Sequence, residues 1–369
     1  METCKKLPDT KNIYLIYFCY LSAIIRKNWG ALGGCRELFK EVVGKAYRPL
    51  SVASSVFGEP FGSPFFLHKL HKGGYTVDLI SITDLSKEDI LEIIRRALEF
   101  KQTESIPQVL QGKFIVTAFF EPSTRTKLSF HRAIKGLGGN VIDFLPSVSA
   151  IQKGETDIDT LLTLESMDID GFIVRVRRNG APLEWKKFIK VPIINGGDGT
   201  NQHPTQALLD LTTMYEHFGR LDLKVAIVGD ILHSRVANSL TQALLMFEAD
   251  VRFCGPREFI PARYDGVNII TEDLREALQG VDVVYALRVQ KERIEKLPIN
   301  IDEFFRRYQI NHESIKLAPQ HAVLMHPGPF NRNIEVSDNI VYSERSLILK
   351  QVKNGVYSRM AVLERVFSR

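Results

Sequence analysis

The chain has 369 residues and 44% hydrophobic content, enough to bury substantial cores, and its length predicts two domains. Its net charge of +5 is unevenly placed. Residues 1–74 carry 11 of the 48 basic and 5 of the 43 acidic residues, a net of +6, which leaves a net of −1 for residues 75–369. The basic excess therefore belongs to an N-terminal extension, and the rest of the chain gives no support for nucleic-acid binding.

The extension, residues 1–74, contains a run at residues 13–25 that is apolar or aromatic except for Ser22. This run is shorter than the ~20 residues that span a bilayer as a helix. A signal peptide requires a cleavage site of small residues shortly after such a run, and none follows this one closely. Targeting to an organelle stays open, although the five acidic residues argue against a transit segment. We predict a poorly ordered appendage with no catalytic role and no membrane partner.

The positions of the cysteines indicate the cellular compartment. Cys4, Cys19 and Cys35 lie in the extension, and Cys254 lies in a predicted apolar strand. There is no Cys-x-x-Cys, metal-ligand spacing or disulfide framework, which favours a reducing compartment and a cytoplasmic location.

Residues 75–369 alternate between short apolar runs and helical patterns, which predicts α/β units with parallel sheets. The predicted strands are 113–120, 141–144, 171–176, 191–194, 224–228, 250–254, 281–286 and 322–325. The predicted helices are 87–100, 160–167, 206–218, 235–247, 273–278, 301–307 and 356–366, with one more after residue 120. Gly219-Arg220-Leu221-Asp222 separates a helix from a new strand and predicts a domain boundary. Gly229 and Asp230 follow a strand without the glycine fingerprint of a dinucleotide fold, so NAD binding is rejected.

The turn at residues 120–126 carries the strongest chemical signal. It follows a predicted buried strand and opens a helix. Small hydroxyl residues at a helix N-terminus leave backbone N–H groups free, the helix dipole adds partial positive charge, and Arg125 adds a full one. This combination favours a phosphate site without the glycines of a P-loop. Taken alone, the same residues would more often form a simple helix cap beside a solvated arginine.

Three further segments change that interpretation. They are Lys153-Gly154-Glu155-Thr156, His203-Pro204-Thr205-Gln206 and His326-Pro327-Gly328-Pro329. Together with Ser123-Thr124-Arg125-Thr126, in this order and at these distances, they resemble the transcarbamoylase family. Arg288-Val289-Gln290-Lys291-Glu292-Arg293 makes the chain similar to the aspartate carbamoyltransferase catalytic chains within it. The resemblance runs from about residue 75 to the C-terminus, and the motifs are highly specific only as a group.

The resemblance implies two open parallel-sheet α/β domains. They are a carbamoyl-phosphate-binding domain at 75–219 and an aspartate-binding domain at 220–353, with a C-terminal helix in 354–369 that returns to the first domain. The implied reaction is direct attack of L-aspartate on carbamoyl phosphate, which gives N-carbamoyl-L-aspartate and phosphate, the committed step of pyrimidine synthesis. It implies a homotrimer and neither a metal nor a cofactor. A regulatory chain or a dihydroorotase partner stays open.

The family's ligand-binding roles fall on matching residues of this chain. The resemblance implies that Arg125, Thr126, Arg175 and His203 are catalytic and that Thr126, Arg175 and His203 converge on the carbonyl oxygen. Carbamoyl phosphate would be held by Ser123, Thr124, Arg125, Thr126, Arg175, His203, Gln206, Pro327, Gly328 and Pro329. Aspartate would be held by Lys153, Arg235, Arg288 and Gln290, with Ser149 and Lys153 supplied by the neighbouring subunit.

Each residue also has a plainer interpretation. Arg175 lies near Arg177 and Arg178 and fits a solvated basic cluster as well as a ligand role. His203 alone is more often a helix-start residue, and Gln206 fits an exposed first turn; only the joint pattern favours function. Two alternatives remain: another amine acceptor, ornithine or N-acetylornithine, or a catalytically silent relative. The ornithine enzymes have a Cys-containing turn and an acidic site, whereas this chain has His326-Pro327-Gly328-Pro329 and basic residues.

Overall fold

The structure of the chain is a computed structural model that describes residues 77–146, 154–288 and 301–368. The extension 1–74, expected to be poorly ordered, lies outside these residues, as do Ser149, Lys153 and Gln290. Residues 72–369 form one compact unit.

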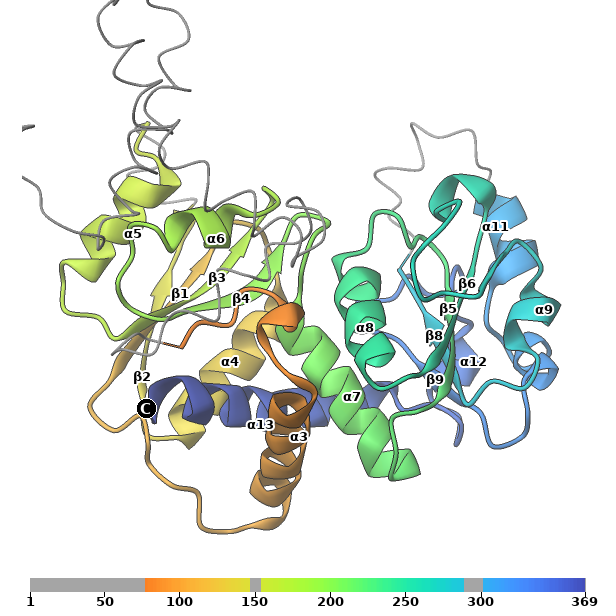
Figure 1. The fold of residues 1–369 in the computed structure, drawn as a ribbon, viewed down its shortest axis with the longest axis horizontal. Coiled ribbons are helices and arrows are strands. Elements are labelled where there is room, and N and C mark those ends of the chain that lie inside the picture. Colours follow the sequence, from red (N-terminus) through yellow and green to blue (C-terminus); the bar gives the residue numbers. More distant parts are fainter. Residues whose placement is uncertain (1–76, 147–153, 289–300, 369) are drawn as a thin grey trace, which may run out of the picture. The chain divides into compact units, whose positions relative to one another are not determined.

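Two parallel sheets organise the described residues, which confirms the predicted fold class (Figure 1). The first has the strand order β2-β1-β3-β4 and the second β7-β6-β5-β8-β9, and neighbouring strands in both are parallel. The strands of the first sheet are β1 (Phe114–Phe119), β2 (Asn140–Phe144), β3 (Gly171–Val176) and β4 (Ile193–Asp198). Those of the second are β5 (Lys224–Val228), β6 (Asp250–Cys254), β7 (Ile269–Thr271), β8 (Val283–Ala286) and β9 (Val323–Met325).

Helices cover both sheets. Beside the first sheet lie η3 (Ile82–Asp84), α3 (Lys87–Gln102), α4 (Thr124–Gly136), α5 (Asp157–Glu165), α6 (Ala181–Trp185) and α7 (Pro204–Phe218). The later elements are α8 (Arg235–Met246), η6 (Arg257–Phe259), α9 (Leu274–Leu278), α11 (Ile301–Tyr308), η7 (Ser314–Leu317), α12 (Asp338–Val341) and α13 (Ile348–Phe367). The last helix, α13, packs against α3, α4 and α7, so the end of the chain lies with the first sheet (Figure 1).

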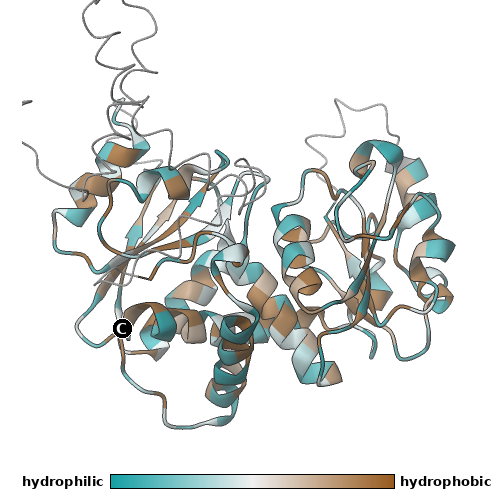
Figure 2. Cartoon of the chain, viewed as in Figure 1, coloured by the Kyte–Doolittle hydropathy of each residue, from teal (hydrophilic) through white to brown (hydrophobic). Residues whose placement is uncertain are grey.

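The strands are apolar along almost their whole length, as expected when both faces of a parallel sheet are covered. All four residues of β8 and all six of β4 are buried, and the strands are mostly brown in Figure 2. The helices are brown on one side and teal on the other. In α3, for example, Ile90, Ile93, Ile94 and Ala97 are buried, at the spacing of one helix face.

Several elements differ from the sequence-based predictions. The C-terminal helix begins at Ile348 instead of residue 356, because residues 348–355 continue its buried face through Gln351 and Asn354, which the apolar pattern does not show. The short strand β7 and the one-turn helices α6 and α12 were not predicted. Three to five residues are too few to establish a periodicity.

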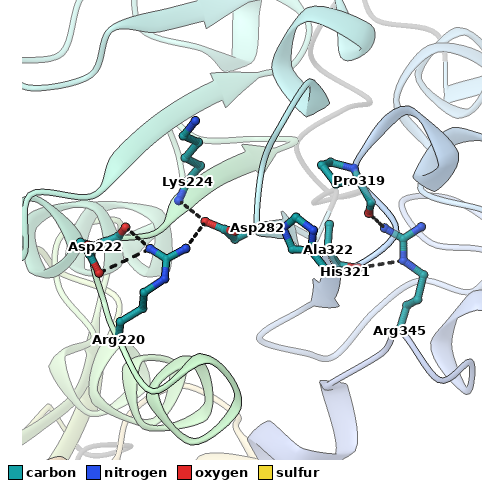
Figure 3. Close-up of polar contacts among 8 residues, drawn as sticks. All are labelled: Arg220, Asp222, Lys224, Asp282, Pro319, His321, Ala322 and Arg345. Atoms are coloured by element: carbon teal, nitrogen blue, oxygen red, sulfur yellow. Dashed lines mark hydrogen bonds and ion pairs between the residues drawn. The ribbon is translucent and has the colours of Figure 1, made fainter.

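The chain passes between the sheets at Gly219, which ends α7 in a left-handed conformation with a φ of 71°. Just beyond it, the Asp282 carboxylate joins the N-terminal ends of the strands of the second sheet (Figure 3). It accepts hydrogen bonds from the Lys224 backbone N–H at 2.9 Å, from Arg220 at 3.2 Å and from His321 at 3.0 Å. These contacts lie at the edge of the sheet opposite to the carboxyl ends of the strands, so they serve the fold and not a ligand.

Candidate active site

The turn between β1 and α4 presents the predicted anion site. Ser123 is the N-cap residue of α4, yet its side chain accepts no hydrogen bond from the helix. The plain capping role is therefore not what the hydroxyl performs. Arg125, in the first turn, has a lowered pKa, and loss of hydration is the cause. A partly dehydrated guanidinium beside a helix N-terminus is a site for an anion.

Arg125 lies directly against Gly328 of the His326-Pro327-Gly328-Pro329 turn. A Cβ added to Gly328 would overlap the Arg125 guanidinium, and Gly328 has a φ of 62°. The backbone conformation favours glycine here, and any larger residue would displace the Arg125 guanidinium. This close approach brings together the turn after β1 and the turn after β9, which lie far apart in the sequence.

Glu121 links two of the predicted ligand arginines. Its carboxylate forms an ion pair with Arg175 Nε at 2.7 Å and another with Arg235 Nη2. Burial and then the nearby charge of Arg235 lower the pKa of Arg175, against the opposing effect of Glu121, to about 10. Sequence reasoning missed Glu121, although a single acid among basic residues of the same turn was a usable signal.

Thr126 and Arg175 meet at Gly196 on β4. The Arg175 guanidinium donates to the Gly196 carbonyl at 3.3 Å, and the Thr126 methyl group lies beside the Gly196 Cα, within van der Waals contact of where a Cβ would be. Thr126 is 6% exposed. Arg175 lies near the carboxyl end of β3, the strand between β4 and β1, and Thr126 lies in the helix that follows β1.

His203 is buried at the N-terminus of α7 and is held by its backbone. Its N–H donates to the Ser239 hydroxyl of α8 at 2.8 Å. Its pKa lies well below the ordinary value, because burial and then the charges of Arg175, Arg235 and Arg359 disfavour the imidazolium. Its Nδ1 has no hydrogen-bond partner within the described part of the chain. His203 is thus a neutral imidazole that presents one donor and one acceptor.

His326 fixes the turn that follows β9. Its Nδ1 accepts the Gly328 N–H at 2.8 Å, and its Nε2 lies 3.6 Å from a Glu335 carboxylate oxygen. Burial lowers the pKa of His326, with Arg125 and Arg288 adding to that effect against Glu335. Sequence reasoning singled out the motif but not this role of the histidine.

Contacts thus join several of the predicted site residues: Arg125 meets Gly328, and Arg175 and Arg235 share Glu121. Ser123, Thr124 and Thr126 lie in the same turn as Arg125, and Pro327 and Pro329 flank Gly328. Ser149, Lys153 and Gln290 lie outside the described residues, so their predicted roles stay predictions. Within the described ranges, no helix is long and apolar enough to cross a membrane. No cluster of three histidine, cysteine or acidic side chains suited to a metal occurs in those same ranges.

The comparisons with known proteins agree with this geometry. The sequence model of the carbamoyl-P binding domain of aspartate/ornithine carbamoyltransferases matches residues 77–216, and that of the Asp/Orn binding domain matches residues 221–366. The chain belongs to the aspartate/ornithine carbamoyltransferase family. The two matched segments meet close to Gly219, where the chain passes from the first sheet to the second.

Relatives within this family are similar over most of their own length. The aspartate carbamoyltransferase catalytic subunit of Solibacter usitatus is 44% identical over 297 residues, which is 78% of this chain and 98% of that protein. The corresponding subunit of Thermus aquaticus is 44% identical over 276 residues, 74% of this chain and 91% of that protein.

Solved structures of the family are similar as well. Aspartate transcarbamoylase from Trypanosoma cruzi, in complex with carbamoyl aspartate and phosphate, has a TM-score of 0.74 and 31% identity, covering 79% of this chain and 96% of that one. Ornithine carbamoyltransferase from Pyrococcus furiosus has a TM-score of 0.72 and 30% identity, covering 80% and 98%. Aspartate and ornithine enzymes therefore match this fold about equally, and the acceptor must be argued from the site.

Proposed function

We propose that this chain is an aspartate carbamoyltransferase, which transfers the carbamoyl group of carbamoyl phosphate to L-aspartate in the committed step of pyrimidine synthesis. The observation that carries the proposal is that Arg125, Arg175, His203 and Arg235 all lie at or after the carboxyl ends of strands, with Arg175 and Arg235 paired to one carboxylate, that of Glu121. Relatives at 44% identity that bear this name support it.

The phosphate group would bind at the N-terminus of α4. Backbone N–H groups of Thr124, Arg125 and Thr126, the Ser123 hydroxyl and the Arg125 guanidinium would surround it. Charge-assisted bonds of this kind strengthen as the phosphate leaves, so they stabilise the transition state more than the bound substrate.

The carbonyl oxygen would face Thr126, Arg175 and His203. Negative charge develops on this oxygen when the amine attacks. A neutral imidazole donates one hydrogen bond without requiring a proton from solution, and the lowered pKa of His203 supports this role. Arg175, already held by Glu121 and the Gly196 carbonyl, would stabilise the charge without reorganising.

The carbamoyl NH₂ group needs acceptors. Gln206 donates its own NH₂ to Asp210 at 3.0 Å, which leaves its amide oxygen as an acceptor. The backbone carbonyls of Pro327 and Gly328 would supply the others, in a turn completed by Pro329. We propose that these groups orient the carbamoyl plane for attack.

The aspartate carboxylates would bind to Arg235 and Arg288, with Gln290 and the neighbouring subunit's Lys153 as further contacts. Arg235 uses Nη2 for Glu121, while its buried Nη1 has no hydrogen-bond partner among the described residues. The guanidinium can therefore keep Glu121 and still bind a carboxylate. Two arginines fit a dicarboxylic amine better than a diamine such as ornithine.

No side chain needs to form a covalent intermediate. The aspartate nitrogen attacks the carbonyl carbon, and the carbon–oxygen bond to phosphate breaks with its electron pair leaving on phosphate. The proton that the amine loses would pass to the departing phosphate. The protein contributes positioning and preorganised charge.

We also propose a homotrimer of this chain in the cytoplasm. Strand β2 is an edge of the first sheet. The exposed apolar side chain of Ile142 lies on it, that of Leu128 lies on α4, and that of Leu145 directly follows β2. Exposed apolar groups at a sheet edge suit a subunit interface. Leu145 also precedes the segment that carries Ser149 and Lys153, the residues expected to reach a neighbouring site. The absence of any disulfide-like cysteine pattern supports the location.

The test is an assay of phosphate release from carbamoyl phosphate with aspartate, ornithine or N-acetylornithine as the acceptor. We expect turnover with aspartate alone. Turnover with another amine would assign the runner-up acceptor. A purified, folded protein that binds carbamoyl phosphate and turns over none of them would be a silent family member.

A further inference from the structure

A fully buried carboxylate lies directly behind the proposed carbamoyl site. Asp210 is on α7, one helical turn after Gln206, and it is 0% exposed. Its Oδ1 accepts hydrogen bonds from Gln206 Nε2 at 3.0 Å and from Gln351 Nε2 at 2.8 Å. Its Oδ2 accepts one from the Tyr285 hydroxyl at 2.6 Å. The three donors come from α7, α13 and β8.

These contacts decide which way the two glutamine amides point. An ionised carboxylate only accepts hydrogen bonds, so both glutamines must turn their NH₂ groups toward Asp210. The amide oxygen of Gln206 is then directed away from Asp210, and it is the atom expected to accept from the carbamoyl NH₂. Without the carboxylate, the amide would be free to rotate by half a turn and present a donor instead.

The same carboxylate reaches the opposite side of the site through Gln351. The Gln351 amide oxygen accepts the backbone N–H of His326 at 2.9 Å. His326 directly precedes Pro327 and Gly328, whose carbonyls are the other expected acceptors, and its Nδ1 holds the Gly328 N–H. One continuous chain of hydrogen bonds therefore runs from Gln206 through Asp210 and Gln351 to the turn after β9.

We propose that Asp210 is a positioning residue that holds both sets of acceptors for the carbamoyl NH₂ in register, and so selects a carbamoyl group over an acyl group without the NH₂. This inference rests on the proposed function, because it assumes the roles of Gln206 and of the turn. It assigns to Asp210, Tyr285 and Gln351 a part that sequence reasoning did not give them.

The selection should depend on pH. Burial raises the pKa of Asp210 to about 7, against the hydrogen bonds from Tyr285, Gln351 and Gln206 and the positive charge of Arg359. Tyr285 on β8 and Arg359 on α13 are the titratable groups that act on it. Protonation converts an acceptor oxygen into a donor. The preference for carbamoyl phosphate should therefore be full well above pH 7 and decline as the pH falls through about 7.

The experiment compares binding of carbamoyl phosphate with binding of acetyl phosphate, which carries a methyl group in place of the NH₂, and of inorganic phosphate. In Asp210→Ala we expect carbamoyl phosphate to weaken roughly tenfold or more, since its acceptors lose their alignment, while the other two ligands change little. In Asp210→Asn the amide oxygen can accept from both glutamines and the NH₂ can donate to Tyr285. That variant should keep the preference and lose its pH dependence.

A matched control is Ser358→Ala. This change removes another buried hydrogen bond between α13 and α7, which the Ser358 hydroxyl donates to the Thr212 hydroxyl at 3.0 Å. It should leave the preference unchanged. Equal weakening of carbamoyl and acetyl phosphate in Asp210→Ala would mean that Asp210 only supports the fold, and no weakening would mean that it positions nothing.

If Asp210→Ala does not fold, Tyr285→Phe tests the proposal instead. It removes one donor to the carboxylate, so the pH at which the preference declines should move upward; an unchanged profile would overturn the proposal. The proposed function fails separately, and visibly, if the wild-type protein itself shows no preference for carbamoyl phosphate over acetyl phosphate.

Discussion

The guanidinium of Arg125 fills the space that a side chain at Gly328 would occupy. Arg125 follows the first strand of one sheet, and Gly328 follows the last strand of the other. The proposed phosphate anchor and the turn of the proposed carbamoyl acceptors can lie in contact here because Gly328 has no Cβ. This makes Gly328 a sensitive position for ligand binding.

Gly328→Ala should weaken carbamoyl phosphate binding by about 10- to 100-fold, because the new methyl group displaces the charged donor from the phosphate. The measurement is a dissociation constant from calorimetry. Gly180→Ala is the matched control, since Gly180 also has a positive φ, at 74°, but open space around its Cα. Both variants should lose some stability, and only Gly328→Ala should lose affinity. Equal affinities in the two variants would contradict the assigned contact.

Arg288→Ala should raise the aspartate KM by about 10- to 100-fold through loss of a charged carboxylate contact. It should change carbamoyl phosphate affinity little, because the phosphate is assigned to α4. Initial rates measured over a grid of both substrates separate the two effects. Arg263→Ala, an arginine whose side chain is 88% exposed, serves as the control. Similar weakening of both substrates would count against the division of the site.

The Asp282 contacts predict a pH effect on stability. Burial alone would raise the pKa of Asp282, but hydrogen bonds and charges, led by the Lys224 N–H, lower it overall. A lowered carboxyl pKa stabilises the fold above the unfolded value of about 3.9 and loses that contribution as the pH falls through the folded value. The Tm deficit of Asp282→Asn should therefore be constant from pH 8 to pH 5 and shrink below about pH 4. Asp222→Asn, a more exposed carboxylate, should show a smaller deficit.

Much of this fold was accessible from the sequence because parallel strands covered on both faces are nearly continuous apolar runs. Strands β3, β5 and β6 have the predicted bounds. Elements of three to five residues, such as β7 and α6, contain too few positions to show a period. The start of α13 was missed because Gln351 and Asn354 are buried polar residues held by long-range hydrogen bonds.

The residues of the site also differ in whether the sequence predicts them. The predicted ligand residues form short local motifs, so a family resemblance finds them. The supporting residues do not. Glu121 gains its role only when Arg235 of a distant segment reaches it, and Asp210 gains its role from Tyr285 and Gln351. Partnerships between segments far apart in the sequence have no local pattern from which to predict them.

The last prediction concerns the proposed trimer, in which Lys153 of one subunit completes the site of its neighbour. Arg125→Ala should reduce turnover by about 10²- to 10³-fold, as loss of a donor to developing charge does, and Lys153→Ala should also be nearly inactive. Each site then needs Arg125 from one chain and Lys153 from the next. A trimer that mixes the two mutants contains one site with neither defect, so dissociation, mixing and reassembly should restore part of the activity.

The control is each mutant dissociated and reassembled alone, which should stay inactive. Mixed trimers must be verified by native mass measurement, with one mutant carrying a mass tag. Restored activity that scales with the fraction of mixed trimers would support the shared site, because a mixed trimer is the only species with an intact Arg125 next to an intact Lys153. Verified mixed trimers without activity would mean that each site is built within one chain, and the role assigned to Lys153 across the subunit boundary would be wrong.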